Sequence, residues 1–176
     1  LVELIAALGF VISYYFFGIS VTTLLFFILV IFFIIIFFID LKHFIIPNEL
    51  SISLMIIGFL KSFDPYLNQY LFPNYLNSLI GGVVGYSIIW VIIFAYKKLR
   101  NKEGMGLGDA KLLSAIGFWF GWISLPFVLF FSSAIALISF LPDLIKNKKS
   151  LSSQIPFGPF IILGTILFLF SKTILL

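Results

Sequence analysis

The fold is decided by one uninterrupted apolar stretch, VTTLLFFILVIFFIIIFFI at positions 21–39. An α-helix that crosses the hydrocarbon core of a bilayer needs about 20 mostly apolar residues. This stretch has that length, and its apolar side chains cover every face of a helix, which is typical of membrane spans and not of amphipathic core helices. The stretch therefore predicts a transmembrane helix.

Similar apolar runs occupy most of the remaining chain. They cover residues 4–19, 50–63, 76–96, 109–123, 125–144 and 158–176. Because lipid offers no hydrogen bonds, runs this long and continuous favour helices over the strands of a barrel. We expect an all-α bundle of about seven transmembrane segments that forms one membrane-embedded domain, residues 1–176. Two segments, 50–63 and 109–123, are short, and we expect the wall of the bundle to be thinnest there.

The composition also indicates a membrane protein. Hydrophobic residues make up 62% of the chain and charged residues only 10%, whereas a soluble domain carries about 25% charged residues. The apolar excess must therefore face lipid. The net charge of +4 forms no basic stripe on a soluble face, so nucleic acid is not expected as a partner. The chain contains no cysteine, which excludes disulfides and thiolate metal sites within it.

The basic residues predict how the segments are oriented. If successive segments alternate in direction, nine of the eleven Lys and Arg residues fall on one side, and only Lys61 and Lys172 fall on the other. Positive residues gather in cytoplasmic loops, so the side with nine is predicted to be cytoplasmic. These nine are Lys42, Lys97, Lys98, Arg100, Lys102, Lys111, Lys146, Lys148 and Lys149.

Two acidic residues lie at segment ends on this predicted cytoplasmic side. Asp40 ends the apolar run 31–39, and Asp109 follows the glycine-rich stretch 104–108. Ionisable residues at membrane depth are costly and mark function by default, although either acid could lie in the interface, and Asp109 could cap a helix. Two carboxylates at one depth can share a proton, so that one activates a water while the other polarises a carbonyl.

Other residues are candidates for supporting this pair. The glycines before Asp109 leave room for an extended substrate backbone. Lys111 either tunes Asp109 and meets the substrate, or is an interfacial lysine. Glu3 lies either inside the bilayer, where its charge is costly, or at the cytoplasmic edge near the pair, and Pro47 shapes the turn after Asp40. The candidate substrate-binding or supporting residues are Gly104, Gly106, Gly108, Lys111, Glu3 and Pro47, and no metal site is expected.

Two pairs of glycines predict a close helix contact. Gly81 with Gly85, and Gly117 with Gly121, repeat the four-residue spacing of small residues. Such pairs let membrane helices approach each other closely. We interpret them as ordinary packing positions.

Four stretches of the chain resemble motifs of one family. DLKHFIIPN at 40–48 resembles the first aspartate motif of the type IV prepilin peptidases (leader peptidases), and EGMGLGDAKLL at 103–113 resembles their second, the GxGD motif. LVEL at 1–4 is similar to the entry into their core membrane region, and IPFGP at 155–159 to the turn before their last helix. GxGD alone is shared with presenilin-like and signal-peptide-peptidase-like proteases, so the specificity lies in the joint pattern.

The resemblance implies a membrane aspartic endopeptidase of the bacterial inner (cytoplasmic) membrane, with Asp40 and Asp109 as its catalytic acids. Such enzymes remove the short basic leader from type IV prepilins and from type II secretion pseudopilins at the cytoplasmic face. The cut typically follows a Gly, just ahead of the hydrophobic helix of the substrate.

Many bacterial members of this family have an additional N-terminal cytoplasmic domain, in which paired cysteines bind zinc. They also methylate the new N-terminus with S-adenosylmethionine. This chain has no cysteine and begins about where that domain would end. We therefore carry over the peptidase activity without a cofactor, and assign neither zinc nor methyl transfer to these residues.

Two other functions stay open at this stage. A proton-coupled transporter would use two membrane acids near the bilayer midplane, with discontinuous helices around them. Here the acids lie at segment ends, which disfavours that function. A non-enzymatic subunit of a pilus or secretion assembly would leave the glycine-rich stretch and both acids without a role.

Overall fold

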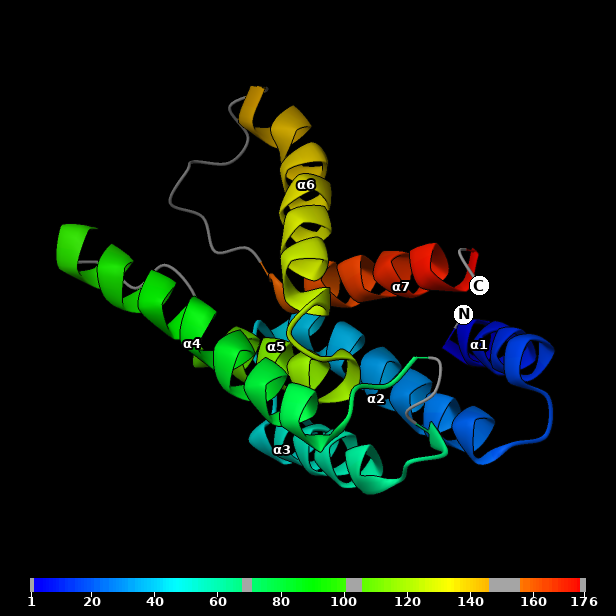
Figure 1. The fold of residues 1–176 in the computed structure, drawn as a ribbon. Helices are drawn as coiled ribbons and strands as arrows, with labels where there is room; N and C mark the ends of the chain where they lie inside the picture. Colours follow the sequence, from blue (N-terminus) through cyan, green and yellow to red (C-terminus); the bar gives the residue numbers. More distant parts are fainter. Residues whose placement is uncertain (1, 68–70, 101–105, 146–155, 175–176) are drawn as a thin grey trace.

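A computed structural model describes residues 2–67, 71–100, 106–145 and 156–174, which form seven α-helices and one 3-10 turn (Figure 1). The described residues contain no strand, so the predicted all-α fold with seven segments is confirmed. The elements are α1 (Val2–Phe17), α2 (Val21–His43), α3 (Asn48–Leu60), η1 (Lys61–Phe63), α4 (Tyr75–Arg100), α5 (Leu107–Phe120), α6 (Ser124–Ile145) and α7 (Gly158–Ile174).

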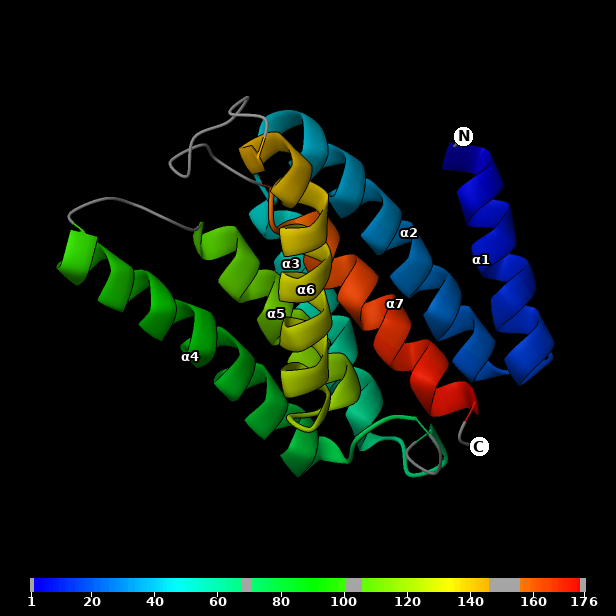
Figure 2. The same cartoon turned by 90° about the horizontal axis from the view of Figure 1, so that it is seen from above.

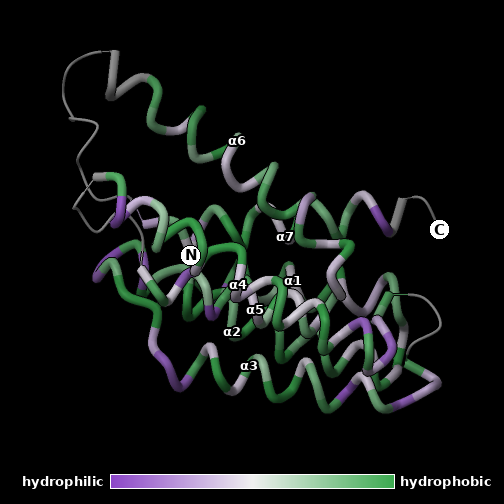
Figure 3. Tube along the Cα trace, turned by 60° about the vertical axis from the view of Figure 1, so that its left-hand side comes forward, coloured by the Kyte–Doolittle hydropathy of each residue, from purple (hydrophilic) through white to green (hydrophobic). Residues whose placement is uncertain are grey.

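The helices differ in their capacity to cross a membrane. Within the described residues, α2, α4 and α6 are long and apolar enough to span one, and α1 and α7 are shorter apolar helices. Figure 3 shows hydrophobic residues along most of the helices and hydrophilic ones mainly near their ends. The chain is therefore a membrane protein. With 13 and 14 residues, α3 and α5 are only about 20 Å long, less than the ~30 Å hydrocarbon core of a bilayer.

Successive helices run in roughly opposite directions, which is the alternation that the charge analysis assumed. Figure 2 shows the starts of α1, α3, α5 and α7 toward one end of the bundle, together with the last turns of α2 and α4, while Figure 1 shows α6 standing away from the other helices. We call this the aspartate end, because Asp40 closes α2 and Asp109 opens α5 there. Lys61 and Lys172 belong to elements that finish at the opposite end. Four of the nine residues in the predicted cytoplasmic group lie outside the described residues, namely Lys102, Lys146, Lys148 and Lys149.

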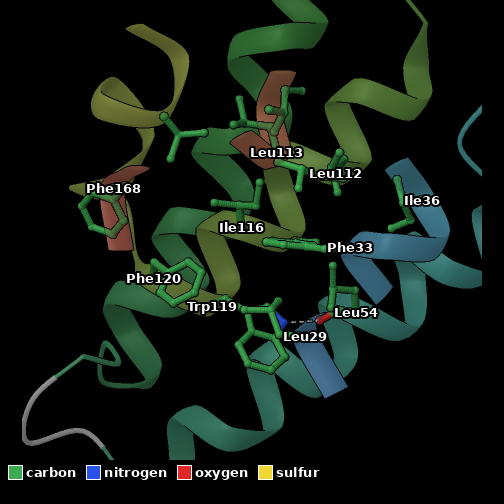
Figure 4. Packing of buried hydrophobic residues seen from close by; sticks show 14 of the residues in the cluster. Leu29, Phe33, Ile36, Leu54, Leu112, Leu113, Ile116, Trp119, Phe120 and Phe168 are labelled. Carbon is green, nitrogen blue, oxygen red and sulfur yellow. Dashed lines mark hydrogen bonds between the residues drawn. The ribbon is translucent and has the colours of Figure 1, made fainter. Parts of the chain in front are cut away.

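The centre of the bundle is α5. Ten of its 14 residues are buried, and Figure 4 shows its side chains between those of α2, α3 and α7. Trp119 of α5 is fully buried and its indole N–H donates to the backbone carbonyl of Leu54 in α3, 2.8 Å away. Because protein surrounds α5, it can be shorter than a full span. The prediction of a thin outer wall at 109–123 is therefore wrong.

The predicted close contact of glycines is confirmed where α4 crosses α5. A Cβ at Gly81 would lie 2.3 Å from the carbonyl oxygen of Gly117, and a Cβ at Gly117 would lie 2.1 Å from that of Gly81. A Cβ at Gly85 would lie 2.7 Å from the carbonyl oxygen of Leu113. Since all three contacts are with backbone, no side-chain movement could relieve them. Only glycine allows α4 to hold α5 at this distance.

Candidate active site

The last turn of α2 and a tight reversal of the chain place Asp40. Helix α2 continues past the predicted end of the apolar run to His43, and Phe44 then adopts a left-handed conformation with φ 57°. The N–H of Phe44 donates to the carbonyl of Asp40, which closes the helix. Pro47 then begins α3 with φ −60°. Proline suits a helix start because the missing N–H has no partner to lose there.

The side chain of Asp40 points into the protein and meets the start of α7. Only 4% of Asp40 is exposed. The backbone N–H of Gly158, the first residue of α7, donates to Oδ2 of Asp40 over 3.0 Å. A Cβ at Gly158 would lie 2.7 Å from the same oxygen. The glycine therefore allows an N–H to reach the carboxylate at a point where any other residue would collide with it.

The first turn of α5 places Asp109. Gly106 precedes the helix in an extended conformation, and its carbonyl accepts a hydrogen bond from the N–H of Asp109. An acid in the first turn is favoured by the helix dipole. The side chain is 8% exposed. A residue that only caps a helix end can stay exposed to solvent, so the burial of Asp109 argues against a role as a cap alone.

The α2–α3 turn joins the two acids into one site. Ile46 of this turn packs against Gly108, where a Cβ would approach its Cβ to 3.0 Å, and against Gly158, where a Cβ would lie 3.0 Å from its Cδ1. Asp40 lies close enough to Asp109 for their charges to interact. Among the described residues, no Lys, Arg or His forms an ion pair with either acid. Within the described part of the chain, the site thus holds two neighbouring buried acids without a paired cation.

The candidate supporting residues are only partly gathered around this pair. Lys111 donates from Nζ to Oδ1 of Asn48 and so ties α5 to the start of α3. Gly106, Gly108 and Pro47 lie in the segments that carry the acids. Glu3 is exposed in α1, and both Figure 1 and Figure 2 place α1 and α5 on opposite flanks of α2. Its role stays a prediction, and Gly104 lies outside the described residues.

Two contributors to the site lie in turns that the sequence indicated, but their contacts were not predicted. The N–H of Gly158 reaches Asp40 from 118 positions further along the chain, and the side chain of Asn48 accepts the hydrogen bond from Lys111. The signal for Gly158 was present, because a glycine directly before Pro159 at the start of an apolar helix predicts a special turn. Its target was not readable, since sequence spacing says nothing about contacts between distant helices.

Comparison with known proteins identifies the family. The sequence model of the type IV leader peptidase family matches residues 27–141, which extend from α2 into α6 and include both aspartates. The chain belongs to the type IV leader peptidase family. The predicted resemblance is therefore confirmed. No solved structure matches the chain.

Several curated members of the leader peptidase family are similar to this chain. A prepilin leader peptidase/N-methyltransferase of Aeromonas salmonicida is 37% identical over 141 residues, which cover 78% of this chain and 46% of the relative. One from Xanthomonas campestris is 32% identical over 96% of this chain and 57% of its own length. The leader peptidase HopD of Escherichia coli is 36% identical over 69% of this chain and 76% of its own length. The chain spans about half the length of the N-methyltransferase relatives.

Proposed function

We propose that this chain is a membrane aspartic endopeptidase that removes the leader peptide from prepilins or pseudopilins. The observation that carries the proposal is the pair of buried acids, Asp40 and Asp109, which lie near each other and have no ion-pair partner among the residues that the structure describes. Burying uncompensated carboxylates costs stability, which makes such a pair a mark of function. Membership in the leader peptidase family and the similarity to prepilin leader peptidases support the substrate class. The acids lie at the ends of continuous helices, which gives the transporter alternative no support.

The chemistry requires one water and one proton shared between the two carboxyl groups. The ionised carboxylate takes a proton from the water, whose oxygen attacks the carbonyl carbon of the scissile peptide bond. The protonated partner donates its proton to the carbonyl oxygen. When the tetrahedral intermediate collapses, the leaving nitrogen takes the proton that the first carboxyl group received from the water, a hydroxyl of the intermediate returns a proton to the second carboxylate, and the C–N bond breaks. The reaction needs no metal or organic cofactor, and methyl transfer is not part of the proposal.

We further propose that the aspartate end faces the cytoplasm of a bacterial inner membrane. The support is the set of basic residues at this end, which includes Lys42, Lys97, Lys98 and Lys111. Positive residues are retained on the cytoplasmic side. A basic leader is retained there for the same reason, so the acid pair and the leader would meet at the same membrane face.

The proposal is tested by replacing each acid by its uncharged isostere. The protein, purified in detergent, is incubated with a prepilin-like substrate, and leader release is measured for wild type, Asp40→Asn and Asp109→Asn. We expect each variant to lose activity by a factor on the order of 10²–10⁴, because a positioned acid or base contributes about that much. The matched control is Asp64→Asn, since Asp64 follows η1 at the opposite end of the bundle and should keep full activity.

The melting temperature is measured on the same preparations. Unchanged melting with lost cleavage supports the proposal. Cleavage at a near-normal rate by either Asp40→Asn or Asp109→Asn would refute it.

A further inference from the structure

An open-sided apolar groove lies between α1, α2 and α7. It has a volume of about 390 Å³. Residues 26–38 of α2 form its floor, and residues 5–17 of α1 and 162–170 of α7 form its walls. Figure 2 shows α1 and α7 on the two sides of α2. At 1.5 Å per residue, the floor is about 18 Å long.

The lining of the groove suits only apolar occupants. Ser13 is the one polar residue among its lining residues, and its hydroxyl donates to the carbonyl of Gly9 in the same helix. This hydroxyl therefore has its partner already. The other side chains are aliphatic or aromatic, apart from Gly9 itself. A charged or hydrogen-bonding ligand would lose its hydration here without compensation.

One end of the groove leads to the acid pair. Its last floor residues, Phe37 and Phe38, lie within one helical turn of Asp40. On the α7 wall, Ile162 lies one turn after Gly158, whose N–H binds Asp40. The opposite end of the groove is lined by residues such as Phe17, beside the α1–α2 connection. The groove is therefore a path between helices from within the apolar region to the site.

We propose that this groove binds the apolar helix that follows the scissile bond of the substrate, an inference that rests on the proposed function. A peptide that lies within lipid must satisfy its own backbone, so the substrate is helical there. An apolar helix binds in such a groove by side chains at i, i+3 or i+4, and i+7. A floor of 18 Å holds about 12 residues of helix. The helix then ends beside Asp40, where the chain must become extended to be cut.

A single lipid acyl chain is the other occupant that an apolar groove admits. It would fill the volume, but it has no reason to end at the acids. Continuity with the catalytic pair therefore favours the peptide. This path does not run past the segment 109–123, where a thin wall was expected, since α5 lies at the buried centre.

The absence of cysteine allows a direct test by disulfide crosslinking. Single cysteines are placed at two positions that line the groove, Ile12→Cys and Ile166→Cys, in an Asp40→Asn background in liposomes. Matched controls are the neighbours Val11→Cys and Leu167→Cys, which are 63% and 42% exposed but do not line the groove. The probe is a synthetic peptide with a basic leader, a Gly at the cut site and an apolar helix that carries one cysteine at stepped positions.

We expect crosslinks from the two lining positions at least about tenfold above those from their neighbours, with a three-to-four-residue period along the probe. Equal crosslinking from lining and neighbouring positions would overturn the proposal. The proposal would also be overturned if a phospholipid with a photoreactive acyl chain labelled the lining positions and the peptide did not.

Kinetics then separate this proposal from the proposed function. In the otherwise wild-type protein, Ile166→Trp should raise KM for the helix-bearing peptide on the order of tenfold, as the loss of an anchoring contact does. Leu167→Trp should leave this KM unchanged. A short peptide without the helix should be cut equally well by the Ile166→Trp and Leu167→Trp variants. If Ile166→Trp cuts the long peptide with an unchanged KM, the groove is not the binding site although the peptidase assignment stands. If Asp40→Asn retains activity, the peptidase assignment itself is refuted.

Discussion

The two ends of α5 hold buried ionisable groups in opposite ways. At its start, Asp109 is buried beside a second acid, Asp40. At its end, Lys61 is only 5% exposed, and its Nζ donates to the carbonyl of Trp119 over 2.9 Å and lies 3.7 Å from the centre of the Phe72 ring. The hydrogen bond to the helix C-terminus and the contact with the ring hold this amine in place. The lysine end is therefore an anchor, while the acid end keeps its charges available for chemistry.

This contrast predicts that changes near the lysine end alter stability, and that changes which displace either acid alter activity. The four substitutions below test that division, from the largest expected effect to the smallest.

The largest effect is expected from Gly117→Ala, in the second half of α5. The new methyl would lie 2.1 Å from the carbonyl oxygen of Gly81, so α4 and α5 must separate. Overpacking costs typically 1–3 kcal/mol and sometimes more, and we expect about 3 kcal/mol here because the obstacle is backbone. Thermal unfolding in detergent measures it. A melting temperature equal to that of wild type would show that the crossing is looser than described.

At the acid end, Gly158→Ala should reduce kcat by about tenfold to a hundredfold. Its methyl would lie 2.7 Å from Oδ2 of Asp40, so either the carboxylate or the start of α7 must move. A small displacement of a catalytic group has effects of this size. KM for a short peptide and the melting temperature should change little. Loss of stability with kcat preserved would place Gly158 among the packing residues and break the comparison.

At the lysine end, Lys61→Ala should lower the free energy of unfolding by about 2 kcal/mol and leave the kcat of the folded protein unchanged. The variant loses the hydrogen bond to the helix C-terminus and the contact with the ring. Lys172→Ala is the control, because Lys172 belongs to the same end and lies 5.8 Å from the Phe168 ring without comparable burial. Its effect should be smaller. A loss of kcat in Lys61→Ala would contradict the division of roles.

The smallest effect is expected from Lys111→Met. This change removes the hydrogen bond to Asn48, which ties the start of α5 to that of α3. A bond at a partly exposed site contributes about 1 kcal/mol or less. A double-mutant cycle with Asn48→Ala isolates the contribution of this hydrogen bond. Each single variant and the double variant should lose the same free energy of unfolding. If Lys111→Met instead lost activity as strongly as Asp109→Asn, Lys111 would belong to the chemistry.

The sequence was sufficient for features that depend on local pattern. Apolar runs gave the helices, alternation of segments placed Asp40 and Asp109 at one end, and the spacing of Gly81 and Gly117 indicated a close crossing. Each of these follows from the period or composition of one segment.

Features that depend on contacts between distant segments could not be read in this way. The sequence gives no sign that Gly158 donates to Asp40, or that Lys61 is buried against Trp119. A lysine at the end of an apolar segment ordinarily reaches toward water. Only the packing of η1 against the end of α5 turns it inward. The position of α5 is a second example. The sequence showed that this segment is short, but it did not show that the segment lies at the centre of the bundle.

The burial of α5 also bears on how the protein is made. A helix of 14 residues that is surrounded by protein has little to gain from entering lipid alone, because it is too short to cross the hydrocarbon core. Helix α5 is stable in its final position only after the neighbouring helices have packed around it. Asp109 travels with this helix, so the two acids come together only when the bundle has closed. During biogenesis, a partly inserted chain therefore carries only one of the two acids in place and has no complete acid pair.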